Sequence, residues 1–480
     1  MTSADARIDR LERQVETLLA KIEAQAATIE AQAARIDALE VENAELRRRL
    51  GENSSNSSKP PSSDAPKDRT ARHGDPPSGK RPGGQPGHKG SKRTLLPASE
   101  VNSVNNFHPP HCRRCARGLP KQRDTDPVRH QVWDLPKVEP IVDEYRLHHA
   151  TCEVCGETTC ATLPEGVPQG AFGPGVLALA TMLVADGHMS RRKVVGVLRD
   201  AFGIDISLGA LSESEAIVSA AVAPAVEEAR VHALAEKAKH VDATTWRQAG
   251  AYKALWVMAT ATVTVFTIAC DATRDTLRTW ITRVCGVLVT DRGSQFGFWA
   301  MTRRQICWAH LIRKYAAFSE HKGRVGEIGR DLLFWSRILI HSYHRVRDGT
   351  CPRAGLQRAS IKIRVAVERL LEEGRDLSVK GVSGSCRDIL DHREAMWRFV
   401  DDPAVEPTNN HGERELRGLV TWRKSSFGSQ SERGNMFAAN LKSVIQTCRK
   451  QRRNVLTYLR SAVHAALHHQ STPSLLRPTP

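Results

Sequence analysis

Three short stretches of this sequence carry acidic residues that could share one site. Asp242 stands in "HVDATTW", and Asp291 closes the apolar run "GVLVTD". In "NNHGERELRGLV", residues 409–420, Glu413 and Glu415 stand among arginines. Phosphoryl transfer on nucleic acid uses two divalent ions, and Mg²⁺ prefers a few carboxylate oxygens on a rigid scaffold. Asp242, Asp291 and one of the two glutamates are therefore candidate ligands of Mg²⁺ or Mn²⁺.

The sequence alone leaves the choice between the two glutamates open. On a helix at about 100° per residue, Leu416, Leu419 and Val420 form the apolar stripe. Glu413 and Glu415 both border that stripe, so helix geometry favours Glu413 only slightly. Glu415 could instead relieve the charge of the surrounding arginines.

Two cysteine pairs have the spacing of a zinc site. Each CxxC places two thiolates on one turn, and two such turns complete a closed tetrahedral site, which predicts structural rather than catalytic Zn²⁺. The alternative is four metal-free cysteines, and His108, His111 or Cys160 could replace one ligand. The four predicted ligands are Cys112, Cys115, Cys152 and Cys155.

The charge of the chain predicts a polyanionic partner. A formal net charge of +17 and a pI near 9.6 favour nucleic acid first and a membrane surface second. The longest apolar stretch, at 176–185, is too short to span a bilayer, and the first residues lack the apolar core of a signal peptide. We therefore expect a cytoplasmic protein that is associated with the nucleoid when it is bound to DNA. A solvated face is the alternative for the densest basic region, whose predicted DNA contacts are Arg414, Arg417, Arg423, Lys424, Arg449, Lys450, Arg452 and Arg453.

The acids need a sheet to position them, and the period of the sequence predicts one. Three strand-like runs at 240–273 are followed by a helix at 274–284 and a strand at 286–296. A meander, a helix and a returning parallel strand form the opening of an RNase H-like sheet. We assign 239–316 to the first part of this catalytic core, 317–405 to a helical insertion, 406–465 to the last part with basic C-terminal helices, and 466–480 to a tail. The CxxH of "CWAH", Cys307 to His310, predicts a packed cysteine and a hydrogen-bonded histidine at a buried strand end, with His310 a candidate DNA or supporting contact.

Four units precede the core. Residues 1–50 carry heptads with β-branched residues at a and Leu at d, which predicts a parallel two-stranded coiled coil over a single solvated helix, with Asn43 fixing the register. Residues 51–100 form a Ser/Pro/Gly-rich basic segment that cannot bury a core, so it is either an inert linker or a phosphate-tracking arm. Residues 101–165 would be the zinc-binding domain. Residues 166–238 are predicted helical, with a helix pair around Gly203 that is more typical of packing than of a DNA-binding helix-turn-helix.

In this order the motifs resemble the insertion-sequence transposases of the IS66 type. The similarity covers nearly the whole chain and rests on "NSSKPPSSD", "GGQPGHKG", the paired CxxC, "HVDAT", "CWAH" and "NNHGERELR". It implies a multidomain α+β DDE transposase with an RNase H-like catalytic domain and a helical insertion, in which Asp242, Asp291 and Glu413 match the catalytic acids. It also implies that the zinc domain engages DNA. The departures "DAT", "DRGSQF" and "TWRKSSFGSQSERG" leave these three acids intact.

The leading hypothesis is therefore Mg²⁺-dependent DNA cleavage at element ends followed by strand transfer. The coiled coil would pair protomers into a homodimer or higher oligomer, and accessory transposition proteins are possible partners. The alternatives are a non-catalytic, transposase-derived DNA-binding regulator and an RNase H-like nuclease.

Overall fold

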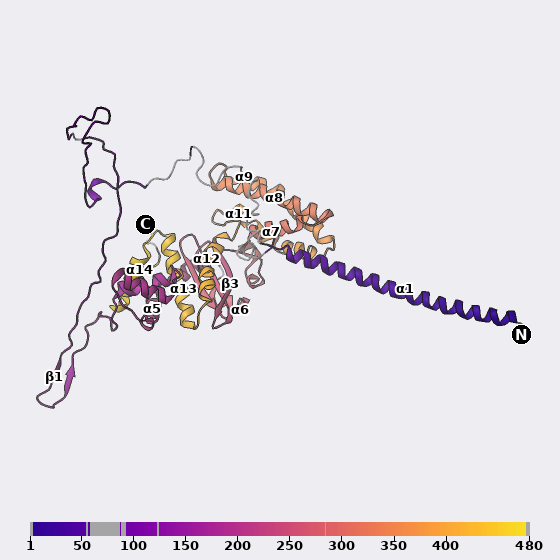
Figure 1. Cartoon of the computed structure of the whole chain (residues 1–480), viewed down its shortest axis with the longest axis horizontal. Coiled ribbons are helices and arrows are strands. Elements are labelled where there is room, and N and C mark those ends of the chain that lie inside the picture. The colour runs from indigo at the N-terminus through magenta and orange to yellow at the C-terminus, as the bar shows by residue number, and fades with distance from the viewer. Residues whose placement is uncertain are drawn as a thin grey trace.

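The structure is a computed structural model, and it describes a long N-terminal helix followed by an open segment and a folded body (Figure 1). Helix α1 runs from Ser3 to Leu50. Its predicted a and d residues with described side chains are exposed, for instance Ile22 at 59% and Ile29 at 65%. The predicted coiled-coil seam is thus an open apolar stripe on this helix. The described residues are 3–53, 56–57, 87, 93–121, 124–283 and 285–476.

Between α1 and the folded body, the described residues form one short 3-10 turn and one hairpin. Most of the basic segment predicted at 51–100 falls outside the described residues. Beyond it, η2 (Ala98–Glu100) is one short turn, and β1 (His149–Thr151) pairs antiparallel with β2 (Thr158–Cys160). Both strands are exposed throughout, so this hairpin buries no core of its own.

A helical unit follows, as the sequence predicted. Helix α3 (Pro174–Ala185) precedes α4 (Arg191–Phe202) and α5 (Leu208–Ala235). Ser190 and Ser207 side chains cap α4 and α5 by accepting hydrogen bonds from backbone N–H groups. Gly203 ends α4 with φ of 66°, the left-handed conformation that glycine adopts without strain. The predicted helix, glycine turn and helix are confirmed.

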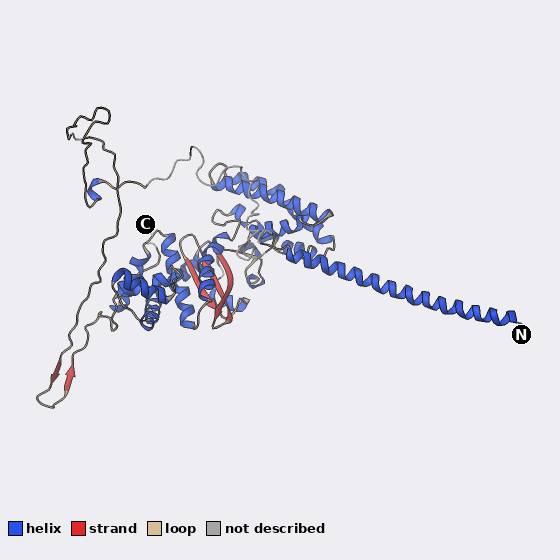
Figure 2. Cartoon of the chain, viewed as in Figure 1, coloured by secondary structure: helices blue, strands red, loops and turns tan. Residues whose placement is uncertain are grey.

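The centre of the body is a five-stranded mixed sheet with strand order β5-β4-β3-β6-β7 (Figure 2). The antiparallel meander leads into α6 and then into β6, which runs parallel to β3, so the predicted topology is confirmed. Strand β7 extends the sheet parallel to β6. The elements are β3 (Ala238–Gln248), β4 (Ala251–Ala259), β5 (Thr264–Ala269), α6 (Arg274–Trp280), β6 (Val287–Thr290), η3 (Ser294–Phe296), η4 (Met301–Arg303) and β7 (Arg304–Ile306).

Helices intervene between β7 and the last acidic motif, and α8 and α9 lie to one side of the sheet (Figure 1). They have a second hydrophobic core, to which Leu332, Leu356 and Val367 belong, and it includes Val289 and Ile306 of the sheet. This second core joins the long helices to the β6–β7 side of the sheet. The elements are α7 (Trp308–Ser319), α8 (Gly323–Arg347), α9 (Arg353–Asp376), α10 (Ser383–Asp391), η5 (Arg393–Met396) and α11 (Arg398–Asp401).

Three helices complete the α+β body: α12 (Asn410–Ser426), α13 (Glu432–Lys450) and α14 (Val455–Leu467). Helix α12 packs on β3, and Gly412 lies so close that an added Cβ would be 3.5 Å from the Cβ of His240. Alternate residues of a strand share a face, so α12 covers the face that carries Asp242. In the described part of the chain, every helix is too short or too polar to cross a bilayer.

Candidate active site

Asp242 and Asp291 come from neighbouring parallel strands. The register pairs Ala238 with Val287 and His240 with Val289, and two residues further it brings Asp242 level with Asp291. Asp242 lies within β3, whereas Asp291 follows the last residue of β6. The two carboxylates therefore meet at the carboxyl end of β6, the edge where open α/β sheets present their ligands.

Glu413 reaches the same place from the first turn of α12. Its Oε1 is 3.8 Å from Nδ1 of His310 and 3.7 Å from a terminal guanidinium nitrogen of Arg313, both on α7. These distances are too long for hydrogen bonds, and Oε1 of Glu413 and Nδ1 of His310 are buried without a partner. The hydrogen bond predicted for His310 is thus missing at this nitrogen, and both atoms lack a hydrogen-bond partner among the described residues.

The charges of Asp291 and Glu413 act on Asp242, although the three carboxylates do not form a ligand group within 4.8 Å among the described residues. Burial raises the pKa of Asp242 to about 7, and the nearby charges of Asp291 and Glu413 contribute to the rise. A hydrogen bond of 2.8 Å from the Ala243 N–H to Oδ1 of Asp242 and the charge of Arg313 only partly offset it. Like charges crowded in this way favour either a proton or a bound cation.

Asn409 fixes the start of α12 against the sheet, and its side chain is buried. Nδ2 donates to the Val241 carbonyl at 3.0 Å, which leaves Oδ1 to accept from Nδ1 of His240 at 3.2 Å. The backbone N–H of Asn409 lies 3.1 Å from Sγ of Cys307 at the start of α7. One residue therefore joins three segments that are far apart in sequence. The sequence analysis quoted this asparagine in a motif but assigned it no role.

Arg304 braces the loop that carries Asp291. This guanidinium is fully buried, and it donates to Oγ1 of Thr290 at 3.1 Å and to the Asp291 carbonyl at 2.8 Å. Burial lowers the pKa of Arg304 to about 10, so it still carries its charge at neutral pH. Sequence analysis missed Arg304 and Arg313, because a single arginine after a strand or a helix turn has no distinctive spacing.

Glu415 faces away from Glu413, toward a different partner set. Its Oε1 is 3.3 Å from Nζ of Lys450 and 3.5 Å from Nε2 of His411. Burial alone would raise the pKa of Glu415, but the hydrogen bond from His411 and the charge of Lys450 outweigh it and lower the pKa. Glu415, which helix geometry could not distinguish from Glu413, is thus paired with basic side chains inside the fold.

The basic residues predicted to contact DNA fall into two groups. Arg449 pairs with Asp186 at 2.5 Å, Lys450 pairs with Glu415, and Arg453 donates to the Ser474 carbonyl at 3.1 Å. Arg423 is partly buried and donates to Oγ1 of Thr245 at 2.7 Å. The four members that are exposed and form no ion pair with a described residue are Arg414, Arg417, Lys424 and Arg452.

The two CxxC pairs form the same turn. Cys112 accepts the N–H of Ala116 at 3.0 Å, and Cys152 accepts that of Gly156 at 2.8 Å. Backbone N–H groups of Cys115 and Arg114 lower the pKa of the Cys112 thiol, and the equivalent N–H groups lower that of Cys152. Both turns therefore stabilise a thiolate, the form that binds zinc. The structure does not bring the two pairs within 4.8 Å of each other as a three-ligand group, so the shared site stays a prediction.

Two groups of potential metal ligands do occur among the described residues. In the first group, the ligand atoms of Cys307, His310 and Glu413 lie within 4.8 Å of one another. The second group consists of His240, Glu406 and His411. Cys307 is packed, as predicted, and burial raises its pKa to about 11, so it carries a proton. The first group thus offers one carboxylate, that of Glu413, beside a protonated thiol and an imidazole.

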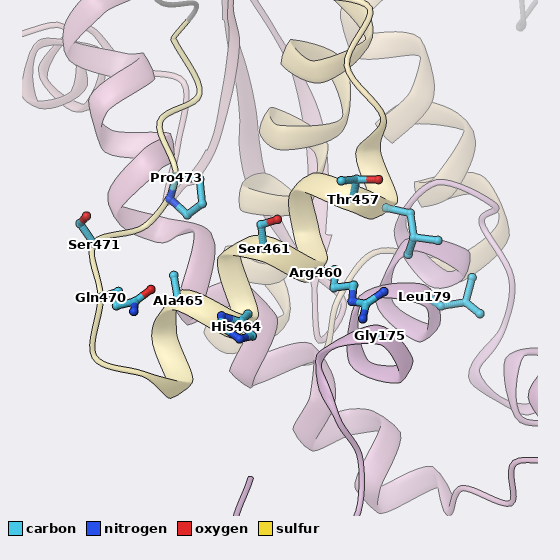
Figure 3. A pocket seen from close by; sticks show the side chains of 11 residues that line it. Gly175, Leu179, Thr457, Arg460, Ser461, His464, Ala465, Gln470, Ser471 and Pro473 are labelled. Carbon is cyan, nitrogen blue, oxygen red and sulfur yellow. The ribbon is translucent and has the colours of Figure 1, made fainter. Parts of the chain in front are cut away.

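A pocket elsewhere in the body is separate from the acids (Figure 3). It lies between α3, α14 and the C-terminal segment, with Arg460 and His464 as its basic side chains. The three acids come from β3, the end of β6 and α12, so this pocket does not include them.

Comparison with known proteins gives matches to two families. The profile described as "Transposase IS66 family" matches residues 169–437, more than half of the 480-residue chain. The profile of a family of unknown function, DUF6444, matches residues 2–94. An uncharacterized protein, y4qI, of Sinorhizobium fredii is 31% identical over 147 residues, which cover 30% of this chain and 27% of that relative.

Proposed function

The chain belongs to the transposase IS66 family, and we propose that it is a DDE-type enzyme that cleaves DNA at insertion-sequence ends and joins them to target DNA. The observation that carries this proposal is the placement of Asp242 and Asp291 on neighbouring parallel strands, with the charge of Glu413 close enough to raise the pKa of Asp242. The strand order β5-β4-β3-β6-β7 supports an RNase H-like assignment for the core, because a meander precedes the first parallel crossover.

The residues fit divalent cations. Three carboxylates converge, one of their oxygens is buried without a hydrogen bond, and the pKa of Asp242 is raised to about 7 by burial and by the other two acids. Hard cations such as Mg²⁺ or Mn²⁺ take oxygen ligands of this kind. We propose that Asp242, Asp291 and Glu413 hold them. When bound, such ions activate the attacking oxygen and stabilise the leaving oxygen.

The remaining residues of the site orient the acids. Asn409 fixes the height of α12 over β3, and through it the position of Glu413. Arg304 holds the backbone of Asp291 through its carbonyl. Arg313 lies 3.7 Å from Glu413 and would be near enough to contact a substrate phosphate that enters beside this carboxylate. Preorganisation of this kind lowers the barrier by removing reorganisation at the moment of reaction.

The N-terminal parts would hold DNA and pair protomers. We propose that Cys112, Cys115, Cys152 and Cys155 share one structural Zn²⁺ and that the resulting domain engages element ends, with α1 joining two copies through its exposed seam. A pair of protomers places two active sites in one assembly, as the joining of two DNA ends requires. The exposed arginines Arg414 and Arg417 would track phosphates on the outer side of α12.

A cleavage assay on labelled DNA that flanks the gene tests the proposal. Wild type with Mg²⁺ should release a 3′-hydroxyl end and form strand-transfer products, whereas Asp291→Asn should abolish both and retain DNA binding. Asp275→Asn, an exposed aspartate at the start of α6, is the matched control and should remain active. Cleavage without strand transfer would favour an RNase H-like nuclease, and DNA binding without any cleavage would favour a non-catalytic regulator.

A further inference from the structure

Two exposed aromatic side chains lie near the C-terminal end of β3. Tyr252, on β4 opposite Arg247, is 67% exposed, and Phe427, just after α12, is 79% exposed. The guanidinium of Arg247 lies 4.3 Å from the centre of the Tyr252 ring and donates to its hydroxyl at 2.8 Å. The tyrosine is therefore held in place from one side while much of it stays in solvent.

The backbone on either side of Phe427 is held firmly. Ser429 pairs with Gln248, its N–H donates to the Arg247 carbonyl at 3.0 Å, and its carbonyl accepts from the Ala249 N–H at 2.8 Å. Gly428 has φ of 95° and passes so close that an added Cβ would be 2.1 Å from the Arg247 carbonyl oxygen. The segment is thus an added edge to β3, and the Phe427 side chain projects from a fixed base.

Phe427 itself adopts a conformation that disfavours a bulky side chain. Its φ is 58° and its ψ is 22°, in the left-handed region, where a residue other than glycine costs about 1 kcal/mol or more. The ring is exposed, so packing does not offset this cost. Helices commonly end in this conformation, but usually at glycine, so an exposed phenylalanine at this position is a departure that packing does not explain.

Positive charge without acidic partners surrounds these rings. Arg247, Arg423 and Lys424 form no ion pair with any described carboxylate, and the first two bond instead to neutral oxygens of Gly250, Tyr252, Thr244 and Thr245. Burial and then the charge of Arg247 lower the pKa of Arg423, so the two guanidiniums repel each other. An unneutralised cluster of this kind attracts a polyanion.

This surface is continuous with the acids along β3. Strand β6 ends at Thr290, which is level with Val241, and Ser429 takes up the same edge of β3 only at Gln248. The intervening edge, from Asp242 onward, is therefore unpaired in the described chain. Six strand residues span about 20 Å, the rise of about six nucleotides in a B-form strand.

We propose that Phe427, Tyr252, Arg247, Arg423 and Lys424, here called the aromatic surface, bind an unpaired nucleotide of the DNA strand that passes the acids. The two rings would stack on the base, and the cations would hold the flanking phosphates. This inference rests on the proposed function, because it takes the substrate strand to enter at Asp242 and Asp291.

The chemistry of the surface favours an unpaired base over the other possible ligands. A duplex hides the faces of its bases and offers phosphates, for which the cations alone would suffice. Exposed aromatic rings interleaved with arginine are the usual platform for single strands, since every base has a face to stack. A protein partner would require acidic side chains to match the same cations, and binding of the probes below separates the two.

Fluorescence anisotropy of the full-length protein with labelled oligothymidine of about 16 nucleotides tests the inference. EDTA is present, so the readout is binding alone. Phe427→Asn removes the ring and keeps a residue that tolerates the left-handed region. We expect it, and Tyr252→Ala, to weaken oligothymidine binding about 5- to 150-fold, the range of base–aromatic stacking. Binding of a duplex of the same length should change less than about twofold.

Two controls make the result specific. Phe334→Ala removes another exposed phenylalanine, 56% exposed on α8, and should change neither affinity. Phe427→Trp should retain oligothymidine binding. Unchanged single-strand binding by Phe427→Asn, or an equal loss on duplex, would overturn the inference. Because no cleavage is measured, that outcome would leave the catalytic proposal standing, and the two failures are distinguished because one is detected as a binding result and the other as a cleavage result.

Discussion

Replacing Asn409 by alanine should uncouple the third acid from the first two. The change removes both side-chain hydrogen bonds and leaves the Val241 carbonyl and Nδ1 of His240 buried without partners. Each orphaned group costs about 1–3 kcal/mol, so we expect a loss of about 2–5 kcal/mol in the free energy of unfolding. For a body of this size that corresponds to a melting temperature lower by about 5–15 °C.

The same variant should lose cleavage activity while retaining its affinity for DNA. A shift of about 1 Å at a catalytic group costs about 100-fold in rate, and the first turn of α12 carries Glu413. The exposed arginines of α12 are untouched, so affinity for end DNA should stay within about threefold in a filter-binding assay, taking the loss of one phosphate contact as the limit.

The neighbouring asparagine supplies the control. Asn410 is exposed, and Asn410→Ala should change the free energy of unfolding by less than about 0.5 kcal/mol. Urea denaturation and single-turnover cleavage, measured on both variants, give the two readouts. If Asn409→Ala unfolds at the same urea concentration as Asn410→Ala, the assignment of Asn409 as the anchor of α12 is refuted.

Four further predictions concern other parts of the molecule. Mg²⁺ should raise the melting temperature of wild type and not that of Asp242→Asn, because the cation relieves repulsion among the three acids; equal shifts in a thermal scan would contradict this. Purified protein should contain one zinc per chain by atomic absorption, lost in Cys112→Ser and retained in Cys160→Ser, and zinc that survives Cys112→Ser would exclude the proposed ligand set. Sedimentation should show Ile22→Glu with Ile29→Glu as a smaller species than wild type, since two charges in the exposed seam of α1 oppose pairing; an unchanged mass would place the contact elsewhere. Burial lowers the pKa of Lys442, so folding disfavours its charged form at neutral pH and stability is recovered as the pH rises from that lowered pKa toward about 10.4. Lys442→Met should therefore be more stable than wild type by about 1–2 kcal/mol at pH 7 in urea denaturation, with the advantage shrinking toward alkaline pH.

The strands and the positions of the two aspartates could be predicted because their signals are local. Alternation in 240–246 and the apolar run before Asp291 each follow from the period of a strand. A meander followed by a helix then leaves few ways to return, and the parallel pairing of β6 with β3 is the result. The helix pair around Gly203 was equally local, because serine caps and one glycine mark its ends.

The supporting residues could not be predicted because their roles depend on packing between distant segments. Asn409 reads as an ordinary helix-capping residue, yet its side chain caps nothing and bonds across to β3 instead. The pairing of Glu415 with Lys450 depends on how α12 lies against the end of α13. Helix geometry alone made Glu413 and Glu415 nearly equal candidates for the third ligand. The contacts in the folded chain show that their environments differ.

The three-way contact at Asn409 also has a consequence for how the site is made during synthesis. Val241, Cys307 and Asn409 leave the ribosome in that order, with the insertion helices between the last two. The insertion can fold around its own core while the third acid is still unmade, but the core of the sheet includes Leu416 and Leu419 of α12 and stays incomplete until that helix arrives. Closing so long a loop is slow, which delays the arrival of α12. A nascent or prematurely ended chain would therefore hold two of the three proposed ligands on an incompletely packed sheet, and under the proposed mechanism it would be unable to cut the DNA from which it is being expressed.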